Sequence, residues 1–195
     1  LERLLERLRS RNPDARMVYL DWSAPTDLRN ASRLNPYIDL YVKKHALREQ
    51  NQYGLTTLGD TNLSDHYARR LGVTEKEHCF PIPADFLPKL MVGPSFATAP
   101  VLISELMQPF SPGSERCIDL HARFTVQGTP WYQAMRSEAE AALGQFSDLQ
   151  LATGDALPLY KYFAELRRSK VCFSPFGYGE VCWRDYESIM TGTVL

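Results

Sequence analysis

A regular alternation of short apolar runs and amphipathic segments after residue 116 is the feature that most constrains the fold of this chain. Three strands are predicted there, at residues 117–124, 148–152 and 170–174. The helices between them begin with Thr129 as N-cap before Pro130, and near Leu157. Because strands that alternate with helices form parallel sheets, we expect an α/β fold of Rossmann-like type, with helices flanking the sheet.

The apolar spacing within these helices predicts which residues face the core. In the first helix they are Met135, Ala139, Ala142, Leu143 and Phe146, and in the second Leu159, Phe163 and Leu166. A third helix, over about 182–190, follows the last strand. A further strand is expected to begin at Thr193.

The first part of the chain carries a weaker form of the same pattern. Leu1, Leu4, Leu5 and Leu8 share one face of a helix that ends before Asn12-Pro13, so we expect that helix to pack against another element. Strands are predicted at 17–20, ending in Asp21, and at 38–42. Residues 43–94 give little secondary-structure signal.

Proline, glycine and serine gather between residues 109 and 116, which predicts a linker there. We therefore divide the chain into two partial Rossmann-like halves, 1–108 and 117–195, that face a cleft. The chain begins at Leu1 and ends on an apolar run after Gly192. From this we expect a segment truncated at both ends, marginally stable and without appreciable activity by itself.

Charge and cysteine content exclude several classes of function. Twenty-two Lys and Arg against 23 Asp and Glu give a net charge of −1, so no global basic field attracts nucleic acid. The four cysteines form no CxxC pair, which favours reduced thiols and a cytoplasmic location over a zinc site or a disulfide framework. No apolar run reaches the length of a membrane span, while peripheral membrane association is left open.

The segment 173–192 is the most informative for function. A predicted strand runs into a loop with Gly177 and Gly179 and then into a helix, where backbone N–H groups can approach phosphate oxygens. Arg184 would add a charge-assisted contact, and Glu180 and Glu187 suit hydroxyl groups of a ribose or a sugar. A tight turn followed by a solvated helical glutamate is the alternative interpretation.

The stretch from Ser174 to Leu195 resembles the nucleotide-sugar signature of GT-B glycosyltransferases, closest to the exostosin-like and bacterial surface-polysaccharide branch. In that branch a Pro-x-Gly loop precedes an Arg, an aromatic residue, a Glu and a Gly. The resemblance implies that Glu187 binds the donor ribose and that Glu180 approaches the donor sugar as a catalytic residue. The spacing between these two acids is one residue shorter than in the commonest pattern.

The same resemblance assigns a role to the end of the strand at 117–124. A basic residue there meets the donor diphosphate in such enzymes, which implies Arg123 as a donor-binding residue and His121 as its neighbour. A structural salt bridge is the alternative for Arg123. On the acceptor side, Asp21 is a candidate catalytic base, although an Asp at a strand end also serves as a turn or cap residue.

These observations predict a glycosyltransferase that moves a sugar from a nucleotide-sugar donor to a hydroxyl of a glycan or other acceptor, in polysaccharide or glycoconjugate synthesis. The chain has no Asp-x-Asp pair and its four histidines lack metal-ligand spacing, so we expect no metal and no cofactor. One alternative is a non-catalytic nucleotide- or glycan-binding Rossmann-like module. Another is a different Rossmann-like enzyme, although no G-x-G-x-x-G follows the first strand of the second half.

Overall fold

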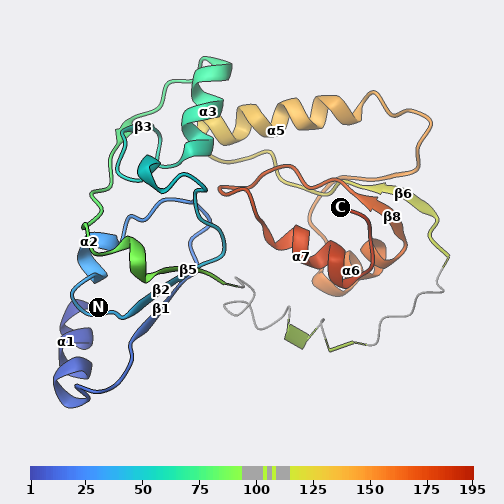
Figure 1. The fold of residues 1–195 in the computed structure, drawn as a ribbon. Coiled ribbons are helices and arrows are strands. Elements are labelled where there is room, and N and C mark those ends of the chain that lie inside the picture. Colours follow the sequence, from blue (N-terminus) through green and yellow to red (C-terminus); the bar gives the residue numbers. More distant parts are fainter. Residues whose placement is uncertain (94–102, 105–106, 109–114) are drawn as a thin grey trace.

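The computed structural model describes residues 1–93, 103–104, 107–108 and 115–195. Two α/β units lie side by side (Figure 1), the N-terminal half (residues 1–93) and the C-terminal half (residues 115–195). Each has a parallel sheet with flanking helices, which confirms the expected α/β class and is consistent with a Rossmann-like fold. The predicted linker lies outside the described residues except for its last two positions.

The N-terminal half is built on a sheet of strand order β1-β2-β5. Its elements are α1 (Glu2–Arg11), β1 (Val18–Asp21), α2 (Ala31–Leu34), β2 (Leu40–Lys43), η1 (Gln50–Gln52), β3 (Thr57–Leu58), α3 (Asn62–Leu71), β4 (Glu77–His78), η2 (Leu87–Lys89) and β5 (Leu90–Val92). The sheet is parallel, with Leu20 opposite Val42 and Val42 opposite Met91. A short antiparallel ribbon, β3-β4, stands apart from it.

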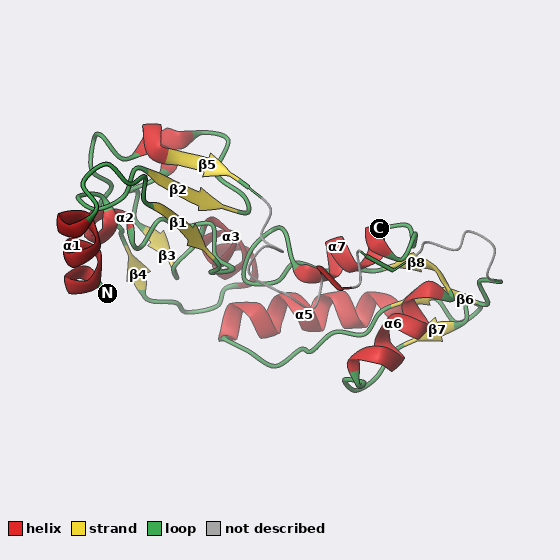
Figure 2. Cartoon of the chain, turned by 90° about the horizontal axis from the view of Figure 1, so that it is seen from below, coloured by secondary structure: helices red, strands yellow, loops and turns green. Residues whose placement is uncertain are grey.

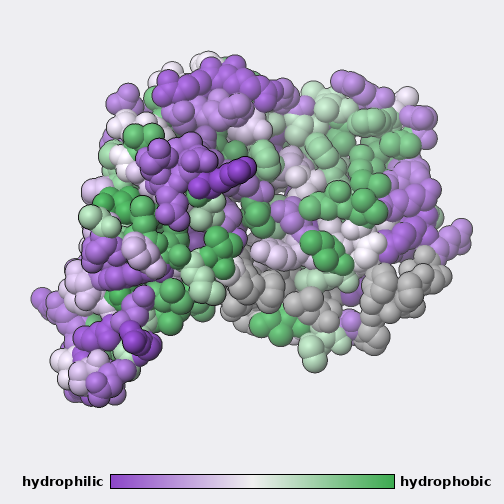
Figure 3. All heavy atoms as spheres, in the orientation of Figure 1, coloured by the Kyte–Doolittle hydropathy of each residue, from purple (hydrophilic) through white to green (hydrophobic). Residues whose placement is uncertain are grey.

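The core of this half lies on one face of the sheet, where Leu28, Leu34, Tyr41 and Phe86 are buried. Helix α1 contributes only Leu5 to this cluster. The helix thus packs on the core through Leu5, as predicted, whereas Leu1, Leu4 and Leu8 of the same face are exposed. Around α1, Figure 3 shows mainly hydrophilic side chains on the face that it displays.

The C-terminal half follows the predicted alternation. Its elements are β6 (Ile118–His121), α5 (Pro130–Leu143), β7 (Leu151–Ala152), α6 (Leu159–Arg167), β8 (Ser169–Cys172) and α7 (Trp183–Met190). The sheet is parallel, with strand order β7-β6-β8, and Val194 pairs in parallel with Val171 at its edge. The first strand therefore lies between the second and the third. No helix in the described ranges is long and apolar enough to cross a bilayer.

The buried faces of the helices differ in part from those predicted. Met135, Leu143, Phe163 and Leu166 are buried as expected, whereas Ala142, Phe146 and Leu159 are exposed. Helix α5 instead buries residues of its first two turns, Trp131, Tyr132 and Arg136. The reason is a contact outside its own sheet, since α5 packs across α3 of the other half.

Helices α3 and α5 join the two halves, and Figure 2 shows these helices from a second direction. Their contact is aromatic. The rings of Tyr67 and Trp131 are stacked with centroids 6.3 Å apart, and Leu63 completes the cluster. Arg70 pairs with Glu138 at its edge. Trp131 is 2% exposed, so the contact buries a large apolar side chain and contributes to the stability of both halves.

Candidate functional site

The strand order of the C-terminal half places a crevice at one edge of its sheet. From β6 the chain goes to β7 on one side, and then to β8 on the other. In open parallel sheets, ligands bind outside the carboxyl ends of the strands where the order reverses, here between β6 and β8. The glycine loop, residues 174–182, leaves β8 at this point and leads into α7.

A groove of about 400 Å³ opens beside the glycine loop. Its lining residues come from α5, α6, the loop and α7: Tyr132, Arg136, Leu159, Tyr162, Gly177, Cys182, Trp183, Arg184 and Glu187. The structure thus brings together three residues that were predicted from the sequence to bind the donor, Gly177, Arg184 and Glu187.

Glu187 lies within the groove as a shielded carboxylate. Its Oε2 accepts a hydrogen bond of 2.6 Å from the hydroxyl of Tyr162. Burial raises the pKa of Glu187 above its ordinary value, and burial together with this carboxylate raises the pKa of Tyr162. The pair forms a fixed hydrogen-bonding site for a hydroxyl group, which a solvated helical glutamate would not.

Two guanidinium groups give the groove its positive charge. Arg184 donates from Nη2 to the carbonyl of Arg123 at 2.6 Å, and its Nε is buried without a hydrogen-bond partner among the described residues. Arg136 donates from Nε to the carbonyl of Phe176 at 2.8 Å and lies over the ring of Tyr132. Burial lowers the pKa of Arg136, as expected for a cation held away from water.

The start of α7 is fixed by a capping box. The backbone N–H of Cys182 donates to Asp185 Oδ2 at 2.7 Å, and the hydroxyl of Ser174 donates to Oδ1 at 2.6 Å. Asp185 therefore ties both ends of the glycine loop to the helix. Lys44 of the N-terminal half lies near enough to interact electrostatically with Cys182 and Asp185.

Gly179 and Glu180 of the glycine loop contact the N-terminal half and do not line the groove. Glu180 accepts from Asn62 Nδ2 at 2.7 Å and from the hydroxyl of Thr26 at 3.1 Å, and lies 3.8 Å from His45 Nε2. Gly179 is buried against the carbonyl oxygen of Ala24. We call this contact the junction. Gly179 allows the two halves to pack closely there, because it has no side chain.

Arg123 and His121, predicted to meet the donor diphosphate, lie outside the groove lining. Arg123 forms an ion pair with Glu165, with distances of 2.6 and 3.1 Å, and also donates to the carbonyl of Asp155. His121 is fully buried, edge-on to the ring of Tyr162. The geometry of Arg123 is that of a structural salt bridge, and its carbonyl positions Arg184.

Asp21, the predicted acceptor-side base, is 4% exposed beneath the carboxyl end of the first sheet. Its carboxylate accepts from Lys43 at 2.8 Å, from Tyr41 at 2.6 Å and from Ser23. Burial opposes its ionisation, but the charge of Lys43 and these hydrogen bonds outweigh burial and lower its pKa. This environment favours a structural carboxylate, and catalysis by Asp21 stays a prediction.

Sequence reasoning missed Tyr132, Arg136 and Tyr162, which line the groove from α5 and α6. The one signal available is the spacing of Tyr132 and Arg136 on one face of a predicted helix that begins at Pro130. In the described ranges, no group of three or more His, Cys, Asp or Glu residues is placed to hold a metal ion.

No protein-family model matches the chain, and no characterised protein matches it in sequence. The chemistry of the groove is therefore inferred from its own side chains. They combine two guanidinium groups, a carboxylate paired with a tyrosine, and aromatic rings, a set that suits a ligand with anionic, hydroxyl and planar parts.

Replacing Gly179 by Ala is expected to destabilise the chain by about 1–3 kcal/mol. The new Cβ would overlap the carbonyl oxygen of Ala24 and lie 2.8 Å from His45 Cε1, so backbone must move. Gly144→Ala is the matched control, because its Cβ meets its nearest neighbour at 3.4 Å in a helical conformation. Urea denaturation of both variants measures the difference, and equal midpoints would contradict the close packing at the junction.

Two buried histidines predict a loss of stability in acid. Burial lowers the pKa of His45 and of His121 to about 4, below the value of about 6.5 in an unfolded chain. Their contribution to stability is therefore complete above pH 6.5 and is lost as the pH falls toward 4, by up to ~1.4 kcal/mol per pH unit for each histidine. In denaturation series between pH 7 and 4.5, His121→Phe should show a smaller slope than the parent; an unchanged slope would refute this assignment.

Proposed function

We propose that the chain is a glycosyltransferase of the GT-B type, and that its groove binds the nucleoside diphosphate part of a nucleotide-sugar. The observation that carries this proposal is the convergence of Gly177, Arg184 and Glu187 on one groove at the point where the strand order reverses. The two-halved arrangement supports it as well. The junction lies between residues that follow β1 and β2 of one sheet and the loop that follows β8 of the other.

Each part of the donor has a partner in the groove. The diphosphate would interact with Arg184 and Arg136 and with the N-terminus of α7, which carries a partial positive charge. A ribose hydroxyl would donate to Glu187, whose orientation is fixed by Tyr162. The ring of Trp183, 36% exposed, offers a flat surface to the base.

Transfer also requires stabilisation of charge on the leaving diphosphate as the bond to the sugar breaks. Fixed guanidinium groups supply this directly, because they are positioned by the protein before the reaction and need little reorganisation. A group that receives the acceptor proton is needed as well. Glu180 is our candidate for a carboxylate near the donor sugar, since it lies at the junction that the two halves share.

A non-catalytic nucleotide- or glycan-binding module is the second candidate function. This candidate is favoured by the environment of Glu180, because both of its carboxylate oxygens already accept hydrogen bonds and are not free to act as a base. Oε1 accepts from Asn62 and Oε2 from Thr26. A binding module needs the groove and no free base. Incubation of the chain with labelled UDP-, GDP-, ADP- and CMP-sugars tests this alternative, because release or transfer of the sugar identifies an enzyme and rules out a non-catalytic module.

Glu187→Ala is expected to weaken binding of the preferred nucleoside diphosphate by about 1–3 kcal/mol, roughly 5- to 150-fold, because a charged hydrogen bond to the ribose is lost. Glu140→Gln, an exposed change on α5, is the control and should bind as the parent does. Isothermal titration with UDP, GDP and ADP measures the affinities. Equal affinity of Glu187→Ala and the parent for all three would rule out the ribose assignment.

Donor binding is expected to be independent of divalent metal, because guanidinium groups take the place of the ion beside the diphosphate. Thermal shifts produced by the nucleoside diphosphate should be the same with EDTA as with added magnesium or manganese. Arg184→Ala should reduce the shift under both conditions. A shift that disappears in EDTA and returns with either metal would contradict this part of the proposal.

A further inference from the structure

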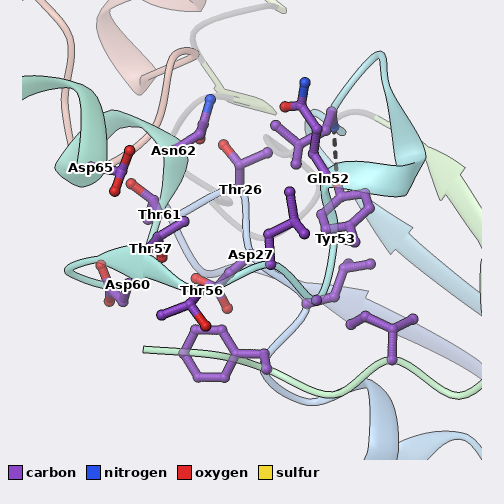
Figure 4. Close-up of a pocket in the computed structure, with 16 residues that line it drawn as sticks. Thr26, Asp27, Gln52, Tyr53, Thr56, Thr57, Asp60, Thr61, Asn62 and Asp65 are labelled. Carbon is purple, nitrogen blue, oxygen red and sulfur yellow. Dashed lines mark hydrogen bonds between the residues drawn. The ribbon is translucent and has the colours of Figure 1, made fainter. Parts of the chain in front are cut away.

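A second pocket, of about 290 Å³, lies in the N-terminal half and shares no lining residue with the groove. It is formed by the loop after β1, the segment from η1 to β3 and the first turn of α3, as the close-up in Figure 4 shows. Ligand pockets commonly span about 300–1,000 Å³. This one therefore suits a small ligand of about one ring.

The charged residues that line this pocket are all acidic. Asp27, Asp60 and Asp65 contribute carboxylates, and no Lys, Arg or His belongs to the lining. Two arginines, themselves outside the lining, hold these groups in place. Arg29 pairs with Asp27 and, at 2.7 Å, with Asp60, while Arg69 pairs with Asp65 at 2.9 Å. Asp27 and Asp65 are each paired through both carboxylate oxygens, whereas Asp60 shares Arg29 with Asp27. The excess negative charge at the pocket therefore lies at Asp60.

The uncharged lining consists of hydrogen-bonding groups and apolar surface in one space. Threonine hydroxyls, the amide of Gln52 and the rings of Tyr53 and Phe80 surround the cavity. Arg29 lies over the Phe80 ring, 5.4 Å from its centroid, which fixes the orientation of that ring. Asn62 also lines the pocket, and its Oδ1 is buried without a donor among the described residues. The pocket therefore offers acceptors that a ligand rich in donors would satisfy.

We propose that this pocket binds a polyhydroxylated amine, the class of compound to which amino sugars belong. The ammonium group meets the carboxylate of Asp60, the hydroxyl groups meet the threonines, and the apolar face of the ring packs on Tyr53 or Phe80. A carboxylated or phosphorylated sugar is disfavoured by the net negative charge that remains at the pocket. This ligand would bind whether or not the groove holds a nucleotide-sugar.

A series of sugars that differ in charge tests this proposal on the full 195-residue chain. Isothermal titration at low salt should rank glucosamine above glucose and glucose above glucuronate. Asp60→Asn keeps the size of the side chain and leaves Arg29 paired with Asp27, so the fold is retained. It should weaken glucosamine at least fivefold and glucose less than twofold. Asp148→Asn, an exposed change in the other half, is the control and should alter neither.

A steric change locates the site. Thr56→Phe places a ring in the pocket and should abolish binding of both glucosamine and glucose. If Thr56→Phe does not fold, Gln52→Trp is used in its place. The proposal is overturned if glucuronate binds as tightly as glucosamine. It is also overturned if glucosamine binds the Thr56→Phe or Gln52→Trp variant as tightly as it binds the parent. Absence of glucosamine binding to the parent overturns it as well.

Discussion

Glu180 accepts hydrogen bonds from Asn62 and Thr26 of the other half, and Gly179 beside it packs so closely against Ala24 that no side chain fits. Hydrogen bonds to a charged group contribute about 1.5–3 kcal/mol each, so this junction is a strong local constraint. Through it the glycine loop is fixed to the N-terminal half, while Asp185 fixes the same loop to α7. The positions of Gly177 and Arg184 in the groove follow from these two attachments.

Next to the junction, the N-terminal half buries an ion pair and a histidine whose ring nitrogens have no hydrogen-bond partner among the described residues. Lys43 and Asp21 are 1% and 4% exposed and form an ion pair of 2.8 Å, with Tyr41 as a further donor. Removing one member of such a pair leaves an uncompensated buried charge, which costs more than the pair contributes. His45 follows the same strand and stays neutral because burial lowers its pKa. The carboxyl end of this sheet is therefore a buried polar region, and His45 in this region lies beside Glu180.

Local patterns predicted the elements of the C-terminal half, since each strand and helix there is encoded by its own apolar spacing. They also identified Gly177, Arg184 and Glu187, because a loop between a strand and a helix places such residues at the end of a sheet. Contacts between residues that are far apart in the sequence could not be predicted from such local patterns. Nothing in the spacing of α5 reveals that Trp131 packs on Tyr67, or that Glu165 pairs with Arg123. Helix α3 was missed although Thr61 and Gly72 cap it, because its apolar content is low.

The net charge of −1 conceals two opposite local fields, one in each half. Arg136 and Arg184 line the groove, whereas Asp27 and Asp60 line the second pocket. At physiological ionic strength, charge is screened within about 8 Å, so each ligand responds to the side chains that surround it and not to the whole chain. The overall charge therefore says little about which ligand binds in either half. It does not exclude a compact anion in the groove, because two fixed guanidinium groups suffice there.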